Sequence, residues 1–224
     1  DLIYLKQIKK KEHKISFKGK FSKNIGKKNT IAILLRLLDQ KKFLEDKKFD
    51  IKIIKNIPQK AGMGGGSMNA ASLISFFINK KILKIQKNQL IELMNKIGSD
   101  VILGIKPTNT ILSSNGDLKR YNKNIKFYTL VVKPSFGCST KYIYSKVKSF
   151  SKSQFTVSKQ KMFSIEYLKT LNNDLESIAF KKYPKLKRIK SYLSGLPNAL
   201  FTRMSGSGSS IVAYFHSKKA CKKA

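Results

Sequence analysis

A glycine-rich segment that joins a predicted strand to a predicted helix constrains this chain more than any other feature. Residues 62–67, Gly-Met-Gly-Gly-Gly-Ser, follow an apolar run over 50–57 that Pro58 ends, and they precede residues 68–80, whose apolar spacing predicts a helix capped by Ser67. Glycine adopts positive φ readily and lets backbone amides approach a ligand. Because a helix N-terminus also presents unpaired N–H groups and a partial positive charge, the segment predicts a phosphate-binding loop. A plain glycine turn is the alternative.

The glycine-rich segment matches neither of two familiar nucleotide-binding loops. It lacks the Gly-Lys-Ser/Thr ending of a P-loop, and it lacks the spacing and the downstream acidic residue of the Rossmann fingerprint. A phosphate bound here would be held by a loop of another kind.

The remaining elements follow from apolar periodicity and from local start and stop signals. Apolar residues make up 41% of the 224 positions and are spread along the chain, which favours one sizeable core or two modest ones. Alternation over 1–21 predicts a pair of strands, Asn29 is expected to cap a helix over 30–38, and Gly98 to end a helix over 87–97. A further strand is expected at 126–133, helices at 141–147, 174–180 and 184–193, and a low-complexity surface loop at 149–161. The chain closes with residues 199–204, a Ser/Gly loop and an apolar run over 211–215.

The net charge of +35 would ordinarily suggest a nucleic acid or an anionic membrane as a partner. The excess is almost entirely lysine, however, because the only arginines are Arg36, Arg120, Arg188 and Arg203. Nucleic-acid readers usually rely on arginine, and AT-rich codons alone would enrich lysine, isoleucine and asparagine. We therefore expect no nucleic-acid partner, although the charge can attract an anionic small molecule.

Cysteine, histidine and hydropathy set further limits. Two cysteines, Cys138 and Cys221, offer neither a disulfide framework nor metal-ligand spacing, which suits a reducing compartment, and two histidines are too few for a metal site. No run of about 18 apolar residues predicts a membrane-spanning helix. We expect a cytoplasmic protein with no membrane partner and no metal-ligating residues of its own.

The segment from Pro58 to Ala71 resembles the ATP-binding signature of the GHMP kinases, Pro-x-x-x-Gly-Leu-Gly-Gly-Gly-Ser-Ser-x-Ala-Ala, with Met63 in place of Leu and Met68 in place of the second Ser. The resemblance implies an α+β, two-domain kinase fold whose N-terminal half is similar to the second domain of ribosomal protein S5. It divides the chain into an ATP-binding domain over 1–124, truncated at its start, and a C-terminal domain over 125–224. The residues implied for ATP binding are Pro58, Gln59, Lys60, Ala61, Gly62, Met63, Gly64, Gly65, Gly66, Ser67 and Met68.

Asp100 is the catalytic residue that the resemblance implies. Its surroundings, Gly98-Ser99-Asp100-Val101, are similar to the Gly-Ala-Asp-Val motif of the branch that acts on a cytidine-diphosphate substrate. A carboxylate beside the substrate hydroxyl can accept its proton as the oxygen attacks the γ-phosphoryl group of ATP. The usual continuation, Val-Pro-Phe-Phe, is replaced here by residues 101–104, Val-Ile-Leu-Gly.

Two later segments are similar to substrate-side motifs of the same family. Residues 134–140 resemble Pro-Gly-x-x-x-Ser/Pro-Thr, which brings Thr140 to the substrate and Tyr144 to a position where its ring can stack on cytosine. Packing of Tyr144 within its helix is the alternative. The run Ser205-Gly206-Ser207-Gly208-Ser209 resembles the third GHMP motif, which assigns Ser205, Gly206 and Ser207 to the site, and residues 173–176, Asn-Asp-Leu-Glu, are interpreted as helix capping with Asp174 at the N-terminus.

The implied activity is transfer of the γ-phosphoryl group of ATP, with Mg²⁺, to the 2-hydroxyl of a cytidine-diphosphate derivative of methylerythritol in non-mevalonate isoprenoid synthesis. Another GHMP small-molecule kinase, or a basic RNA-binding protein with an S5-like fold, are the alternatives. The chain begins at Asp1 and nothing in it matches the opening Ala-Lys-Ile-Asn-Leu segment of the family. We therefore expect a fragment that lacks the N-terminal catalytic lysine and catalyses poorly alone, and the sequence leaves the oligomeric state unknown.

Overall fold

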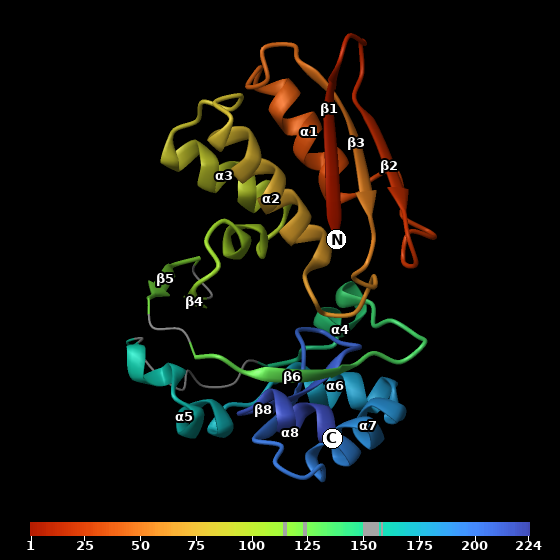
Figure 1. Ribbon diagram of the computed structural model, residues 1–224, viewed down its shortest axis with the longest axis vertical. Coiled ribbons are helices and arrows are strands. Elements are labelled where there is room, and N and C mark those ends of the chain that lie inside the picture. The colour runs from red at the N-terminus through yellow and green to blue at the C-terminus, as the bar shows by residue number, and fades with distance from the viewer. Residues whose placement is uncertain (114–115, 123–124, 150–156, 158) are drawn as a thin grey trace. The chain divides into compact units, whose positions relative to one another are not determined.

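The computed structural model describes residues 1–113, 116–122, 125–149, 157 and 159–224 (Figure 1). They form two compact units, one of residues 1–58 and 64–107 and the other of residues 59–63 and 108–224. Each unit contains both helices and strands, which confirms the α+β expectation. The division at residue 124 stays a proposal, and the segments over which it differs from the compact units are 59–63 and 108–124.

The first unit contains a three-stranded sheet of β1 (Leu2–Ile8), β2 (Lys14–Lys18) and β3 (Lys48–Ile54) in the order β1-β3-β2 (Figure 1). Strand β3 runs antiparallel to β1 and parallel to β2, so the predicted pairing of the first two strands with each other is wrong. The reason is burial: Phe49, Ile51 and Ile53 alternate along β3 and are at most 1% exposed, which places this strand in the centre.

The helices of the first unit are α1 (Thr30–Gln40), α2 (Gly65–Asn79) and α3 (Lys87–Ile97), followed by the 3₁₀ turn η1 (Val101–Gly104). The predicted cap of α1 is confirmed, because the side chain of Asn29 accepts a hydrogen bond from the amide of Ala32 at 3.0 Å. The rings of Phe49 in β3 and Phe77 in α2 lie 5.0 Å apart, which joins α2 to the sheet within one apolar core.

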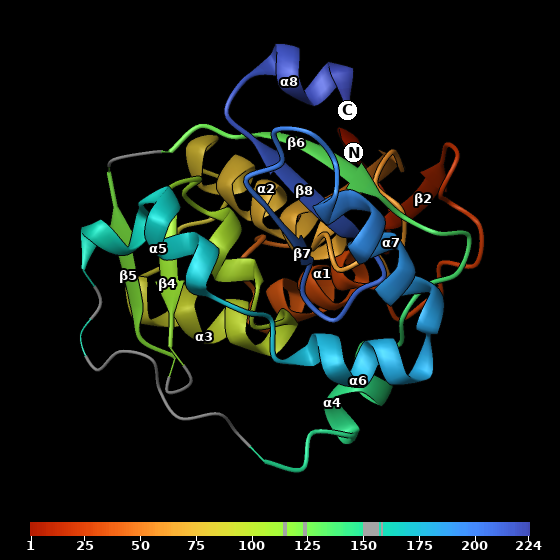
Figure 2. The same cartoon turned by 90° about the horizontal axis from the view of Figure 1, so that it is seen from below.

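The second unit contains a hairpin and a three-stranded antiparallel sheet (Figure 2). The hairpin consists of β4 (Asn109–Leu112) and β5 (Leu118–Tyr121), and the sheet has the order β6-β8-β7, with β6 (Tyr128–Val132), β7 (Phe201–Met204) and β8 (Ile211–Phe215). Its helical elements are α4 (Thr140–Ser145), η2 (Gln160–Phe163), α5 (Ile165–Thr170), α6 (Leu175–Lys182), α7 (Pro184–Ser194) and α8 (Lys218–Lys223). The hairpin, η2, α5 and α8 were not predicted, and the loop expected at 149–161 lies largely outside the described residues.

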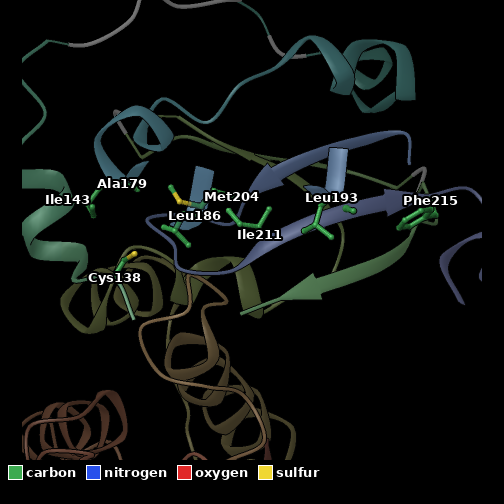
Figure 3. Packing of buried hydrophobic residues seen from close by; sticks show 9 residues of the cluster. Cys138, Ile143, Ala179, Leu186, Leu193, Met204, Ile211 and Phe215 are labelled. Atoms are coloured by element: carbon green, nitrogen blue, oxygen red, sulfur yellow. The ribbon is translucent and has the colours of Figure 1, made fainter. Parts of the chain in front are cut away.

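Helix α7 packs on the sheet of the second unit through Leu186 and Leu193, which are seven residues apart and so face the same side (Figure 3). They contact the core that contains Ile211 and Phe215 of β8, and all four side chains are at most 1% exposed. Burial of a side chain of this size stabilises a fold by about 1.5–3 kcal/mol. The packing fixes β7 and β8, and with them the connecting turn, residues 205–210.

Candidate active site

Helix α2 begins three residues earlier than predicted, at Gly65 instead of residue 68, and this places three amides at the predicted phosphate loop. Gly64 occupies the cap position with φ 62°, and the first intrahelical bond runs from the amide of Met68 to the carbonyl of Gly64 at 2.9 Å. The predicted cap by Ser67 is therefore wrong, because a left-handed glycine already starts the helix. The amides of residues 65–67 precede Met68, the first amide that donates within the helix, and so have no acceptor in the helix itself, as at the start of any α-helix. This end of the helix has the donors and the partial charge to bind an anion.

The first part of the same loop, residues 59–63, is hydrogen-bonded to the turn that joins β7 and β8. The hydroxyl of Ser205 donates to the carbonyl of Gly62 at 2.7 Å, and the amide of Ser210 donates to the carbonyl of Ala61 at 3.1 Å. The carbonyl of Lys60 accepts from the amide of Cys138 at 3.1 Å. Two segments that resemble separate GHMP motifs thus share a backbone network, which the sequence did not predict.

Asn173 and Glu176 hold the end of β7, where capping of α6 was expected. The side-chain amide of Asn173 donates to the carbonyls of Met204 at 2.9 Å and Gly206 at 2.7 Å, and the Glu176 carboxylate accepts from the amide of Met204 at 2.7 Å. Asp174 does stand at the helix N-cap, but its side chain makes no capping bond. The Asn-Asp-Leu-Glu segment therefore supports the turn over 205–210. It also caps α6 as expected, but through Asn173, whose Oδ1 accepts from the amide of Leu175 at 3.0 Å, and not through Asp174.

A hollow of about 1280 Å³ in the second unit brings several predicted substrate residues together. Tyr144, Ser205 and Gly206 line it. Thr140 and Ser207 are not among its lining residues, and their hydroxyls are hydrogen-bonded to each other at 2.9 Å. Tyr144 is 59% exposed, so its ring does not pack into the core of the unit. An exposed ring and several hydroxyls around a hollow can hold a flat polar base.

Arg203 and Tyr214 also line this hollow, although the motifs did not single them out. Burial lowers the pKa of the Arg203 guanidinium and raises the pKa of the Tyr214 hydroxyl. The guanidinium donates to the carbonyl of Leu168 at 2.7 Å and also to that of Leu171. These bonds connect the C-terminal end of α5 to Arg203, which lines the hollow. No sequence motif marks Arg203 or Tyr214, and their roles follow only from the contacts in the folded chain.

Asp100 stands at the start of η1, directly after α3, and its side chain is exposed. Its carbonyl accepts from the amide of Leu103 at 3.2 Å, and the hydroxyl of Ser99 lies 3.4 Å from its Oδ1. The next two residues, Val101 and Ile102, are buried and fix the turn against the first unit. An exposed carboxylate on an anchored turn can meet a substrate hydroxyl without reorganising the backbone.

Neither a metal-ligand cluster nor a membrane-spanning helix occurs in the part of the chain that the structure describes. No group of three His, Cys, Asp or Glu side chains there could hold a metal ion. None of the described helices has both the length and the apolar character needed to cross a membrane.

Comparisons with known proteins place these features in a family. The model of the GHMP kinases N terminal domain matches residues 29–109, and the model of the GHMP kinases C terminal region matches residues 162–224. The class of the protein follows: the chain belongs to the GHMP kinases, and within them to the 4-diphosphocytidyl-2-C-methyl-D-erythritol kinases. Membership of this narrower group follows from sequence relatives of that name.

Two relatives from different bacteria show how similar the chain is to these kinases and how much of their length it covers. The 4-diphosphocytidyl-2-C-methyl-D-erythritol kinase of Pelagibacter ubique (strain HTCC1062) is 68% identical over all 224 residues, which cover 80% of that protein. The kinase of the same name from Buchnera aphidicola subsp. Schizaphis graminum (strain Sg) is 34% identical over 203 residues, or 88% of this chain and 66% of that protein.

Solved structures of two kinases have the same fold. A 4-(cytidine 5'-diphospho)-2C-methyl-D-erythritol kinase aligns with a TM-score of 0.71 at 21% identity, over 99% of this chain and 79% of the other. The homoserine kinase from Cytophaga hutchinsonii ATCC 33406 also aligns with a TM-score of 0.71, at 17% identity, over 99% and 78%. At these identities the likeness shows the fold and does not distinguish the acceptor.

Proposed function

We propose that the protein transfers the γ-phosphoryl group of ATP to the 2-hydroxyl of 4-diphosphocytidyl-2-C-methyl-D-erythritol, a step of non-mevalonate isoprenoid synthesis. The observation that carries this proposal is the 68% identity to the Pelagibacter kinase of that name over the whole chain. The glycine-rich loop and the polar hollow described above support it, because the reaction requires a triphosphate site and a site for a nucleotide-like acceptor.

The ATP site in this proposal extends from Pro58 to Met68. Amides at the start of α2 and the dipole of that helix stabilise the charge of the transferred phosphoryl group. ATP enters such sites with Mg²⁺, which prefers oxygen ligands and keeps several waters. Met68 supplies a thioether where the family pattern has a serine hydroxyl, so the phosphates, water and Ser67 are the oxygen donors that fit the ion here.

The acceptor site consists of Thr140, Tyr144, Ser205, Gly206 and Ser207. Tyr144 stacks on the cytosine ring, a contact that contributes about 1–3 kcal/mol in comparable cases. The hydroxyls of Thr140 and Ser207 supply donors and acceptors to the polar part of the acceptor. Lys146 and Lys148 also line the hollow and attract the diphosphate.

Asp100 is the proposed general base. It accepts the proton of the 2-hydroxyl as that oxygen attacks the γ-phosphorus, so that a bond forms from the acceptor oxygen to phosphorus and the bond to the β,γ-bridging oxygen of ATP breaks. ADP leaves, and the acceptor carries the new phosphate.

A transfer assay with γ-labelled ATP tests the proposal in the full-length protein. We expect labelled product from 4-diphosphocytidyl-2-C-methyl-D-erythritol and a loss of kcat of at least about a hundredfold in Asp100→Asn, the scale of general-base catalysis. Asp46→Asn, which changes an exposed carboxylate in the loop after α1, is the matched control and should leave kcat unchanged.

Two further arms separate the alternatives. Homoserine and mevalonate are offered as acceptors, since kinases so named share the fold, and labelling of either one instead would replace the proposed substrate. Steeply salt-dependent binding of generic RNA without any transfer from ATP would favour the RNA-binding alternative. The two free cysteines suit a reducing compartment, and we propose a cytoplasmic enzyme without a nucleic-acid or membrane partner.

A further inference from the structure

A buried carboxylate lies at the base of the glycine-rich loop and is not part of any motif described above. The side chain of Asp1 is fully buried, and that of Lys55, its ion-pair partner, is 6% exposed. Asp1 belongs to the residue run that leads into β1, whereas Lys55 follows β3. A buried charge pair of this kind persists where hydrogen bonds satisfy both groups.

The carboxylate of Asp1 binds both chain segments that flank the loop. On the side before the loop, its Oδ1 accepts from the amides of Asn56 and Ile57, each at 2.8 Å. On the side after the loop, its Oδ2 accepts from the side-chain amide of Asn69 in α2 at 2.7 Å, and the amino group of Lys55 donates to the same oxygen. One side chain therefore closes the base of the loop with four hydrogen bonds.

We infer that Asp1 is a positioning residue of the phosphate loop: its carboxylate clamps residues 55–57 to Asn69 and thereby fixes where the loop begins and where α2 starts. The inference rests on the proposed ATP site and deepens it. Glycine gives the loop its freedom, and a loop that must present amides to a phosphate gains affinity when its two ends are held in place.

The chemistry of the clamp requires an acid at this position. Oδ1 of Asp1 accepts hydrogen bonds from two backbone amides. These two donors need an acceptor with two free lone pairs, which either a carboxylate oxygen or an amide oxygen supplies. Oδ2 receives Lys55 and Asn69, both of which are donors, and an asparagine would place a donating nitrogen there. Burial also lowers the pKa of the Lys55 amino group, so its charge depends on an anionic neighbour.

The test uses the full-length protein with ATP and the acceptor, and compares Asp1→Asn with the exchange variant Asp1→Asn/Asn69→Asp. The single change should raise the KM for ATP about tenfold or more, because two donors then face the asparagine nitrogen. The double variant again has one carboxylate and one amide at the contact between residues 1 and 69, so we expect its KM for ATP to return most of the way to the wild-type value. Asp50→Asn, which loses a partly exposed pair with Lys14 at 3.4 Å, is the matched control and should leave the KM unchanged.

Hydrogen exchange at the amides of residues 56–67 supplies a readout that does not depend on catalysis. A clamp predicts faster exchange in this segment of Asp1→Asn than in the wild type, with little change in α3. If Asp1→Asn does not fold, Asn69→Ala leaves the carboxylate in place and should still raise the KM and speed exchange in the same segment.

The possible outcomes distinguish the clamp from the proposed function. If Asp1→Asn loses folding stability while its KM for ATP and its amide hydrogen exchange at residues 56–67 stay unchanged, the ion pair is merely structural and the inference is overturned. The inference is also overturned if the KM of the double variant Asp1→Asn/Asn69→Asp is no better than that of Asp1→Asn. A wild type that binds ATP but phosphorylates another acceptor would refute the proposed substrate. In that case, amide hydrogen exchange at residues 56–67 and the ATP affinity of the Asp1 and Asn69 variants would still show whether Asp1 positions the loop.

Discussion

The hydroxyl of Ser205 donates to the carbonyl of Gly62 at 2.7 Å, which ties the glycine-rich loop to the turn between β7 and β8. The two residues are 143 positions apart in the sequence. Their contact leaves no space for a side chain at residue 62, because an added Cβ would overlap the carbonyl oxygen of Ser205. Gly62 also has a φ of 71°, a backbone conformation that residues other than glycine rarely adopt.

A series of three glycine substitutions separates the effect of space from the effect of backbone conformation. Gly62→Ala should cost more than either control, because it combines a steric overlap with an unfavourable φ. Gly64→Ala has a φ of 62° but open space, and it should cost about 1–2 kcal/mol of unfolding free energy. Gly26→Ala meets no atom within 4 Å and should be neutral or slightly stabilising.

Urea denaturation and the KM for ATP measure this series. We expect Gly62→Ala to raise the KM for ATP at least tenfold, beyond its effect on stability, because the loop must move away from Ser205. Equal effects of Gly62→Ala and Gly64→Ala on both quantities would show that only backbone conformation matters at this loop.

Local signals predicted the elements whose ends depend on their own residues. The predictions of the cap at Asn29 and of the end of α3 at Gly98 are both confirmed, since a side-chain cap and a terminal glycine act within a few positions. The predicted start of α2 is wrong by three residues, because a left-handed Gly64 competes with the hydroxyl of Ser67 and only the backbone geometry decides between them.

Contacts between residues far apart in the sequence could not be predicted from local patterns. The apolar alternation of β3 indicated a strand, but its place between β1 and β2 depends on which strand can bury the most on one face. In the same way, the motifs around Gly62 and Asn173 could be predicted one by one. Their hydrogen bonds to residues 204–206 join segments at least 31 positions apart, and no local pattern specifies them.

Gly104 should also be intolerant of a side chain. Its φ is unexceptional, so the reason here is lack of space and not backbone conformation. A Cβ there would lie 2.6 Å from the Cβ of Ala71 and 2.9 Å from the sulfur of Met68, both in α2. Met68 can rotate away, whereas Ala71 cannot. Gly104→Ala should therefore destabilise the protein by about 1–3 kcal/mol, the usual cost of overpacking, when unfolding is measured in urea.

Gly98→Ala is the matched control for Gly104→Ala, since its Cβ would meet only Val101, at 4.0 Å. The two glycines lie on either side of Asp100, so they also report on the turn that holds the proposed base. We expect Gly104→Ala to lower kcat more than it changes the KM for ATP, because the turn must shift away from α2. If Gly104→Ala and Gly98→Ala have the same free energy of unfolding, the turn can move away from α2 without destabilising the protein.

The two cysteines should differ sharply in reactivity. Cys138 is fully buried in the core of the second unit, and burial raises the pKa of its thiol above the ordinary value near 9.0. Cys221 in α8 is partly exposed. Because the thiolate is the nucleophile, an aromatic disulfide reagent at pH 8 should label one thiol quickly and the second only after denaturation.

The raised pKa of Cys138 also gives a sign for the pH dependence of stability. The folded state holds the thiol proton more tightly than the unfolded state, so this contribution is complete below the unfolded pKa and is lost as the pH rises through the higher folded pKa. The wild type should therefore lose unfolding free energy above about pH 9 more steeply than Cys138→Ala, which has no thiol to titrate. Equal labelling rates of both thiols in the native protein, together with parallel stability curves, would show that Cys138 is accessible to solvent through local opening. In that case, the packing of Cys138 with Ile143 and Met204 would contribute less to the second core than its full burial indicates.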